Sequence, residues 1–442
     1  MRRFLLLAIV FIACGRDDAA SSSGAVDDDA GSRDAGTRPP FDAGIEDASP
    51  GDADAPPDGG IPKIKYVFVL VKENHTFDSY FTGYPGAESS MTYKSGNSML
   101  QRPIAPDGPL SCDVAHSWSN AYAAYDNGAM DGFSASSTCA DPNTPFYRYT
   151  EQQIPNYWQL ARNFVLADHF FSTLLTSTTP GHFATVAAQS PFYGNADSSK
   201  GCSVPSSDRG TVAAYNRDTC NDRGDVDACF DVPTIVDKLP PGMTWRAYGP
   251  TSGGNVATPF NFALKVGGDA AIRAAHFRSQ TQLVSDLDKG DIPNLIYANV
   301  PGPLELSEHP PAAPCGGENF TVQLTNRLMK SAHWNEMAIL ITWDDWGGFY
   351  DHVPPALEKC QKTPGFRLPL IIASPYAKEG YVLKTVSEQA SIARFIEDVF
   401  GMPRMAARDG HARDATSGSL LDAFDFTQAP RAGLSLSIRN CP

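Results

Sequence analysis

The chain has 442 residues and a formal net charge of −15. Between Arg16 and Gly60 there are 12 acidic and 3 basic residues, so this segment carries −9 and the remaining residues only about −6. Nothing in this balance indicates a nucleic-acid partner, because proteins that bind nucleic acid carry a basic surplus that neutralises phosphates.

The first residues have the pattern of an export signal. Arg2 and Arg3 precede an apolar run that ends at Ala13, which is too short to span a bilayer and predicts a signal peptide over residues 1–13. The next residue, Cys14, stands in a sequence that resembles a bacterial lipobox, in which the cysteine is lipidated. We therefore expect an exported protein, either a cell-envelope lipoprotein that contacts the membrane through an N-terminal lipid anchor or a secreted protein.

Residues 14–60 differ in composition from the rest of the chain. They are rich in Asp, Ala, Ser, Pro and Gly and have no apolar periodicity, so they can bury almost nothing. This segment predicts a disordered acidic tether. The folded part then spans residues 61–442, which we expect to form one catalytic domain.

The cysteine count also favours export. If Cys14 carries lipid, eight cysteines remain, an even number that suits up to four disulfides in an oxidising compartment. The eight are Cys112, Cys139, Cys202, Cys220, Cys229, Cys315, Cys360 and Cys441. Their spacing does not give the pairing.

Apolar strand patterns alternate with helical patterns along the folded part. Strands are predicted at 64–71, 244–248, 294–300, 337–343 and 368–373, and helices at 155–164, 180–189, 232–239, 281–289, 319–334 and 387–400. This alternation predicts an α/β fold in three layers, with a mostly parallel central sheet covered by helices on both faces.

The stretch from Ala338 to Pro355 carries the clearest chemical signal. A buried strand ends in Asp344 and Asp345, and Gly347 and Gly348 then allow the chain to turn. In open α/β sheets ligands bind at such C-terminal strand ends. Two adjacent carboxylates there repel each other unless a cation or a proton lies between them, so the pair predicts a metal site.

A second signal precedes the helix predicted at 180–189. Thr179 is a good N-cap and Pro180 a good first helical residue. The hydroxyl of Thr178 would then lie beside the positive end of a helix, where an alkoxide or a phosphate oxygen is stabilised.

Five motifs follow one another along the folded part. They are E-N-H-T-F-D-S-Y-F-T-G at 73–83, H-S-W-S-N-A-Y-A-A-Y-D-N-G-A-M-D-G-F at 116–133, D-H-F-F-S-T-L-L-T-S-T-T-P-G-H at 168–182, S-E-H-P-P at 307–311, and W-D-D-W-G-G-F-Y-D-H-V-P-P at 343–355. In this order they resemble the bacterial phosphoesterases, the family of non-haemolytic-type phospholipases C and related acid phosphatases. The chain departs from that pattern with Ser177 for proline, Gly181 for asparagine and Asp345 where many members carry Glu.

The resemblance implies an alkaline-phosphatase-like fold and the hydrolysis of phosphate esters. It implies that Thr178 is the nucleophile and forms a phosphothreonine, and that His116 and His309 bind phosphoryl oxygens and protonate the leaving group. The metal ligands that it implies are Glu73, Asn74, Asp344, Asp345 and the oxygen of Thr178. This oxygen-rich set suits Ca²⁺, Mg²⁺ or Mn²⁺, and histidine participation admits Zn²⁺ or Fe. His352 is a further candidate, as a ligand or as a residue that orients Asp344.

Three alternatives stay open at this point. The first is an enzyme of the acid phosphatase type that acts on a small phosphate ester. The second is an enzyme of the phospholipase C type that acts strictly on phospholipid head groups. The sequence has no C-terminal β-sandwich extension of the kind that larger phospholipases carry, which weakens the case for a membrane-bound lipid. The non-enzymatic alternative is a surface binding protein on the same fold.

Overall fold

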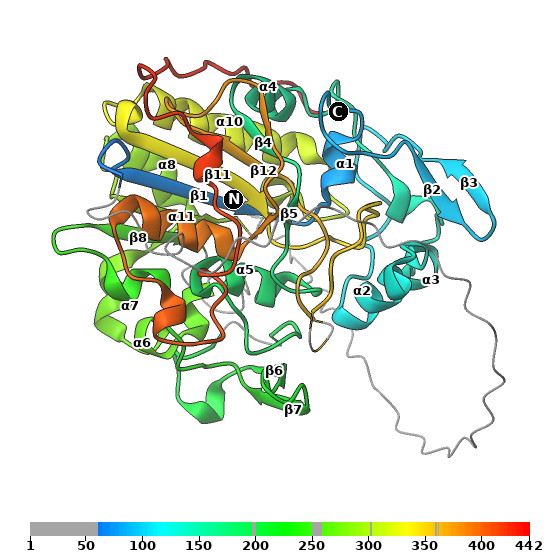
Figure 1. Ribbon diagram of the computed structural model, residues 1–442, viewed down its shortest axis with the longest axis horizontal. Helices are drawn as coiled ribbons and strands as arrows, with labels where there is room; N and C mark the ends of the chain where they lie inside the picture. The colour runs from blue at the N-terminus through cyan, green and yellow to red at the C-terminus, as the bar shows by residue number, and fades with distance from the viewer. Residues whose placement is uncertain (1–60, 197–199, 250–258, 301–302, 359, 361) are drawn as a thin grey trace, which may run out of the picture. The chain divides into compact units, whose positions relative to one another are not determined.

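The computed structural model describes residues 61–196, 200–249, 259–300, 303–358, 360 and 362–442. The signal peptide and the tether predicted for residues 1–60 lie outside the described residues. The described part is built around one large sheet with helices packed against it (Figure 1).

Eight strands form the central sheet, in the order β13-β4-β12-β11-β1-β10-β8-β9. Their bounds are β1 Tyr66–Lys72, β4 Val165–Ala167, β8 Trp245–Gly249, β9 Phe277–Ser279, β10 Leu295–Asn299, β11 Met337–Trp343, β12 Leu370–Ala373 and β13 Tyr381–Leu383. Only β12 runs antiparallel to the other seven strands of this sheet. The predicted mostly parallel sheet is therefore confirmed.

The middle of the sheet is apolar on both faces. Strand β1 pairs in parallel with β10 on one side and with β11 on the other. All seven residues of β11 are buried, and so are six of the seven residues of β1. A parallel strand covered on both faces has no polar face to alternate with, which is why these segments read as continuous runs of Val, Ile, Leu and Phe.

Helices cover the sheet on two sides (Figure 1). Helices α4 and α10 lie on one side and α5 and α11 on the other. Their bounds are α4 Pro155–Asn163, α5 Thr178–Ala187, α8 Gln280–Asp288, α10 Pro314–Lys330 and α11 Ala390–Phe400. The layers are thus helix, sheet and helix, as the sequence predicts.

Smaller elements occupy the long connections. The hairpins are β2 Thr92–Ser95 with β3 Ser98–Gln101 and β6 Thr211–Tyr215 with β7 Asp222–Asp227, and β5 Phe170–Phe171 pairs with β14 Ser387–Glu388. The short helices are α1 Phe77–Phe81, α2 Trp118–Tyr125, α3 Phe133–Ser136, α6 Leu264–Gly267, α7 Ala270–His276 and α9 Leu304–Ser307.

Some predicted boundaries are wrong for physical reasons. Helix α10 begins at Pro314, five residues before the predicted start at 319, and includes Gly316 and Gly317. A side chain at Gly317 would lie 2.2 Å from Cγ of Glu308, so glycine is needed there despite its low helix propensity. The helix predicted at 232–239 is only a short 3-10 helix, Ile235–Lys238.

All eight cysteines of the folded part are paired. The bridges are Cys112–Cys139, Cys202–Cys229, Cys220–Cys360 and Cys315–Cys441. The predicted set of four disulfides is therefore present in the structure, and it fits an oxidising compartment. Among the residues that the structure describes, we find no helix with the length and apolar character to cross a membrane.

Candidate active site

Two central strands end side by side and bring the first acidic residues together. Lys72 at the end of β1 pairs with Trp343 at the end of β11, and the amide of Asp344 donates to the carbonyl of Lys72 over 3.0 Å. Glu73 and Asp344 therefore follow at the same edge of the sheet. Parallel strands end at one edge, which is where α/β proteins place their ligands.

The turn after β11 depends on a glycine. Gly347 has φ +58°, and a Cβ atom there would lie 2.4 Å from the carbonyl oxygen of Asn74. Only glycine fits such a close approach in this conformation. The amide of Gly347 donates to Asp345 Oδ1 over 2.7 Å, so the turn also fixes the second carboxylate.

Glu73 and Asp344 share a histidine from helix α5. His182 Nε2 lies 3.3 Å from Glu73 Oε1 and 3.6 Å from Asp344 Oδ2, and all three side chains are buried. The other ring nitrogen of His182 donates to Oδ1 of Asn299, the last residue of β10, over 3.1 Å. This second hydrogen bond fixes the ring so that Nε2 faces the two carboxylates.

Thr178 is the first residue of α5 and contacts the second aspartate. Its hydroxyl donates to Asp345 Oδ2 over 3.3 Å. The structure corrects the predicted cap, because Ser177 occupies the N-cap position and Thr179 lies inside the helix. The Thr179 hydroxyl instead accepts the amide of Ala196 over 3.1 Å, since the chain after α5 folds back against the helix start.

Asn74, His116 and His309 complete the predicted set. Asn74 Nδ2 lies 3.1 Å from His116 Nε2 and can donate to it while the His116 ring is neutral, and His309 Nε2 lies 3.8 Å from Glu73 Oε2. The two imidazole rings are 5.8 Å apart. In each histidine Nδ1 donates to a backbone carbonyl over 2.6 Å, that of Val114 for His116 and that of Pro310 for His309. Both rings therefore turn Nε2 toward the acidic groups.

The loop that carries His309 is anchored to the end of β1. Glu308 is fully buried and adopts a positive φ of 76°. Its carboxylate lies 2.9 Å from Lys72 Nζ and accepts a hydrogen bond from Tyr80 over 2.7 Å. This buried ion pair fixes the residue before His309 to the strand that leads into Glu73.

Several buried oxygens at this edge have no hydrogen-bond partner. Within the described residues, neither carboxylate oxygen of Asp344 and not Oδ1 of Asn74 has a hydrogen bond. Burial raises the pKa of Asp344 well above its usual range, and the charges of Asp345 and Glu73 raise it further. Burial also raises the pKa of Asp345 to about 6, against the lowering effect of His116. Buried oxygens without hydrogen bonds are expected to have another partner, and a bound cation would supply it.

The electrostatic surroundings of His116 favour its protonated form. Burial opposes protonation, but the charges of Asp345 and Asp113 outweigh it and raise the pKa of His116. An imidazolium in this place can donate to a phosphoryl oxygen or protonate a leaving group.

His352 does not join this group. Its Nδ1 lies 2.6 Å from Asp78 Oδ2, within a buried cluster that also holds Asp351 and Arg367. The guanidinium of Arg367 pairs with both aspartates, at 3.0 and 3.1 Å, and supplies their counter-charge. The structure thus gives His352 a partner other than Asp344, because the chain turns away from the sheet edge after Gly348.

His182 is the site residue that the motif comparison passes over. It follows Thr178 by four positions in one helix, and residues four apart lie on the same helix face. That spacing was the feature of the sequence from which His182 could have been predicted as a site residue. Gly181 between them is also constrained, since a Cβ atom there would lie 2.3 Å from the carbonyl oxygen of Asp344. The departure from the family's asparagine therefore lets α5 approach the strand end closely.

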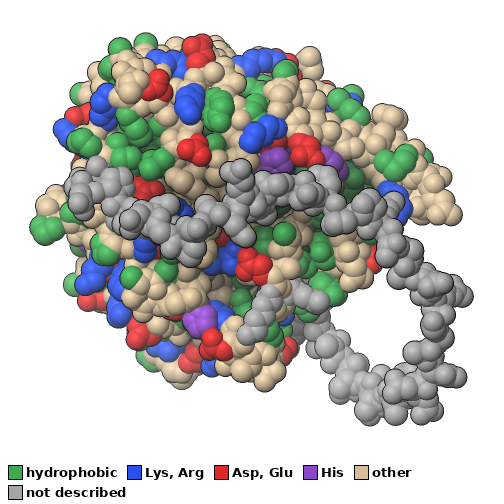
Figure 2. Space-filling view, viewed as in Figure 1, with side chains coloured by type: hydrophobic (Ala, Val, Ile, Leu, Met, Phe, Trp, Pro, Cys, Tyr) green, Lys and Arg blue, Asp and Glu red, His purple; other side chains and the backbone are tan. Residues whose placement is uncertain are grey.

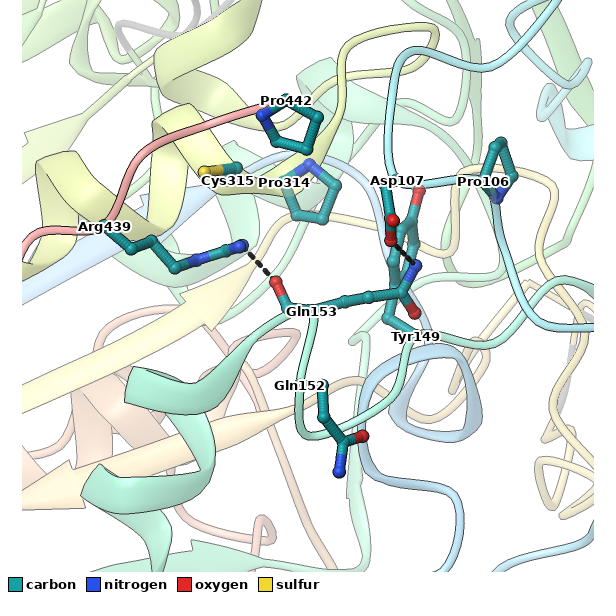
Figure 3. Close-up of a pocket in the computed structure, with 9 residues that line it drawn as sticks. All are labelled: Pro106, Asp107, Tyr149, Gln152, Gln153, Pro314, Cys315, Arg439 and Pro442. Atoms are coloured by element: carbon teal, nitrogen blue, oxygen red, sulfur yellow. Dashed lines mark hydrogen bonds between the residues drawn. The ribbon is translucent and has the colours of Figure 1, made fainter.

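A cavity of about 200 Å³ lies elsewhere in the molecule (Figure 3). Arg439 donates to the carbonyl oxygen of Gln153 there, and the Gln153 amide donates to Asp107 over 2.8 Å. None of the residues that line it belongs to the cluster at the sheet edge.

On the face shown in Figure 2, Lys and Arg side chains lie interspersed with Asp and Glu. The buried cluster at the ends of β1 and β11 is therefore our candidate active site.

The fold and the site together define an α/β enzyme whose polar groups gather at the carboxyl edge of a mostly parallel sheet. The model of the Phosphoesterase family matches residues 64–403. The chain belongs to this family, and it is a hydrolase of phosphoric esters.

Curated relatives are similar over most of the chain. Phospholipase C A of Mycobacterium tuberculosis (strain CDC 1551 / Oshkosh) is 24% identical, covering 85% of this chain and 79% of the relative. Non-hemolytic phospholipase C of Burkholderia pseudomallei (strain K96243) is 23% identical, covering 84% and 60%. Non-specific phospholipase C1 of Arabidopsis thaliana is 24% identical, covering 83% and 72%.

Among solved structures, a protein in the alkaline phosphatase superfamily from Vibrio parahaemolyticus is similar with a TM-score of 0.36 and 10% identity, over 79% of this chain and 69% of that chain.

Proposed function

We propose that the protein hydrolyses phosphate esters with the help of a divalent cation, through a phosphothreonine formed on Thr178. The observation that carries the proposal is the contact of the Thr178 hydroxyl with Asp345, at 3.3 Å, next in the chain to Asp344, whose two buried carboxylate oxygens have no hydrogen-bond partner among the described residues. A hydroxyl, a cation site and the positive end of a buried helix then meet in one place.

The cation would be held by Glu73, Asn74, Asp344 and Asp345, with the Thr178 oxygen beside it. When bound, it supplies Lewis-acid chemistry, which lowers the pKa of the threonine hydroxyl and neutralises charge on the phosphoryl oxygens. The oxygen donors favour Ca²⁺, Mg²⁺ or Mn²⁺, and His182 as a neighbouring nitrogen donor admits Zn²⁺ or Fe.

The chain's own residues carry the two chemical steps. Thr178 Oγ1 gives its proton to the Asp345 carboxylate, 3.3 Å away, and attacks phosphorus, so that a new O–P bond forms as the bond to the leaving group breaks. His116 or His309 gives a proton to the departing oxygen. In the second step the same histidine takes a proton from water and the water oxygen attacks phosphorus. The Thr178 O–P bond then breaks, Asp345 returns the proton to Thr178 Oγ1, and inorganic phosphate or a phosphomonoester is released.

The substrate is of the acid phosphatase type or the phospholipase C type. The curated relatives are named phospholipases C, which favours a diester with a phospholipid head group. A small soluble phosphomonoester is the alternative that the same site chemistry permits.

For the N-terminal part we propose a signal peptide at residues 1–13, a lipid anchor on Cys14 and an acidic tether up to residue 60, ahead of a catalytic domain at residues 61–442. The four disulfides support folding outside the cytoplasm.

Hydrolysis of p-nitrophenyl phosphate and of p-nitrophenyl phosphocholine, with and without EDTA, tests the proposal. We expect turnover of at least one substrate, loss of that turnover in EDTA, and recovery when a divalent cation is returned. Full activity in a preparation verified to be metal-free would refute the cation. A folded, metal-replete protein that turns over neither substrate would favour the binding protein.

A further inference from the structure

Lys362 lies inside a group of three aromatic rings. Its Nζ atom is 4.1 Å from the ring centre of Trp118, 4.6 Å from that of Tyr193 and 5.4 Å from that of Tyr215. Trp118 begins α2 and Tyr215 ends β6 (Figure 1), so residues distant in sequence form this cage. We call Trp118, Tyr193 and Tyr215 the aromatic cage.

The Lys362 ammonium forms cation–π contacts with all three rings. Among the described residues, no carboxylate lies within 4.0 Å of Lys362 Nζ, and Lys362 itself is only 9% exposed. The Asp222 carboxylate instead accepts a hydrogen bond from the Tyr193 hydroxyl over 2.9 Å. The cage therefore holds its ammonium group mainly through the negative faces of the rings.

The aromatic cage is tied to the segment that carries Thr178. The amide of Leu175 donates to the carbonyl of Lys362 over 2.7 Å, and the hydroxyl of Thr176 donates to the carbonyl of Tyr193. Trp118 follows His116 by two residues, which the chain can span in at most about 7 Å. The cage thus stands beside the two segments that carry Thr178 and His116.

Three aromatic rings around one point form the arrangement that binds quaternary ammonium groups. Here the chain's own ammonium already occupies it, and a second cation would meet both a filled space and a like charge. We propose that Lys362 excludes esters with a quaternary ammonium head group, such as phosphocholine, and selects phosphate esters whose head group is neutral, anionic or absent. The inference rests on the proposed phosphoesterase function, because it assigns the head-group preference of that site.

The test compares Lys362→Ala with the wild-type protein in two independent measurements. The first is the ratio of kcat/KM for p-nitrophenyl phosphocholine to kcat/KM for p-nitrophenyl phosphate. The second is binding of tetramethylammonium, followed by tryptophan fluorescence and calorimetry. We expect the variant to raise the ratio at least about tenfold and to bind tetramethylammonium, and the wild-type protein to show no such binding.

Matched variants separate charge, space and the cage itself. Lys362→Arg keeps the charge and should behave as wild type, while Lys265→Ala, at an exposed lysine paired with Asp231, should leave the ratio unchanged. Trp118→Ala combined with Lys362→Ala should abolish the new binding. If Lys362→Ala does not fold, Lys362→Gln removes the charge with less loss of volume and should still raise the ratio.

The outcomes are distinct. An unchanged ratio without tetramethylammonium binding in folded Lys362→Ala would overturn the proposal. An equal loss on both substrates without such binding would do the same, since it would make Lys362 a support of the Leu175 segment. If neither the wild type nor any variant hydrolyses either substrate, the phosphoesterase proposal fails. The binding measurement still decides whether Lys362 keeps other cations out of the aromatic cage.

Discussion

The hydroxyl of Thr178 donates to Oδ2 of Asp345 across 3.3 Å, although 167 positions separate the two residues in the chain. The contact exists because the start of α5 meets the end of β11, and because Gly181 leaves room for the carbonyl of Asp344. The contact connects the proposed nucleophile, Thr178, with one of the proposed cation ligands, Asp345.

Replacing Thr178 by valine should abolish turnover while the fold survives. Valine keeps the branched shape and removes the hydroxyl, so kcat should fall by orders of magnitude. Thr179→Val is the matched control, because it loses only the hydrogen bond from the Ala196 amide. It should cost about 1 kcal/mol of stability and far less rate. Steady-state kinetics and urea unfolding measure both effects, and equal rate losses would remove the distinction between the two hydroxyls.

Replacing Asp344 by asparagine should separate stability from metal binding. In the metal-free protein its raised pKa means that the folded state holds a proton that the unfolded state releases, so stability falls as pH rises above the unfolded pKa. At pH 8 in EDTA, the free energy of unfolding of the variant should therefore exceed that of the wild type by about 1–3 kcal/mol, and the variant should melt at a higher temperature.

Added cation should reverse that order. At 100 times the dissociation constant, the wild type should gain about 2.7 kcal/mol and the variant almost nothing. Thermal melts with EDTA or with Mn²⁺ measure this, with Asp288→Asn, at an exposed carboxylate, as the control. A cation-dependent gain that is the same in the variant would remove Asp344 from the ligand set.

His182 should be as sensitive to mutation as the residues that the motifs indicate. His182→Gln removes the ring nitrogen that faces Glu73 and Asp344, so metal affinity or kcat should fall by about 10- to 100-fold. Metal content by mass spectrometry and kinetics at saturating metal distinguish the two losses. His411→Gln, at a partly exposed histidine, serves as the control and should change neither. Unchanged metal content and rate in His182→Gln would make this histidine a packing residue.

The pair of His352 and Asp78 should make stability depend on pH near neutrality. Burial lowers the pKa of His352, but the hydrogen bond and charge of Asp78 outweigh it and raise the pKa above the usual value. The folded state then binds more protons than the unfolded state, so this contribution is complete below the unfolded pKa and is lost as pH rises through the folded pKa. It should amount to about 1 kcal/mol.

His352→Gln should flatten that part of the stability profile and leave metal content unchanged. Urea unfolding between pH 5.5 and 9 in EDTA, relative to wild type, checks the slope, and metal analysis checks the second expectation. A variant that loses its metal would return His352 to the candidate ligands.

The central strands and their chemistry were predictable because several physical constraints agree there. Strand β11 has the predicted bounds, Met337–Trp343, since burial on both faces demands an unbroken apolar run that ends where Asp344 begins. Short edge strands such as β13, Tyr381–Leu383, were missed, because three residues give no periodicity to detect. The cysteine pairing could not be predicted either, because spacing alone permits many connectivities.

Within the site, the misses have local causes. Thr179 has the residue type of an N-cap, but the amide of Ala196 reaches its hydroxyl only after the chain has folded back. His352 follows the acidic motif closely, but the turn at Gly347 and Gly348 carries it to Asp78. Sequence patterns report residues next to one another in the chain, whereas these partners are set by tertiary contacts.

The central claim is that Thr178 carries the phosphoryl group during turnover. Acid quenching of the metal-loaded enzyme during hydrolysis of p-nitrophenyl phosphate, followed by peptide mapping by mass spectrometry, tests it directly. We predict one phosphorylated peptide with the phosphate on Thr178, absent from Thr178→Val. Phosphate on Thr176, Ser177 or Thr179, or no phosphopeptide from an enzyme that shows a burst of p-nitrophenol, would contradict the account.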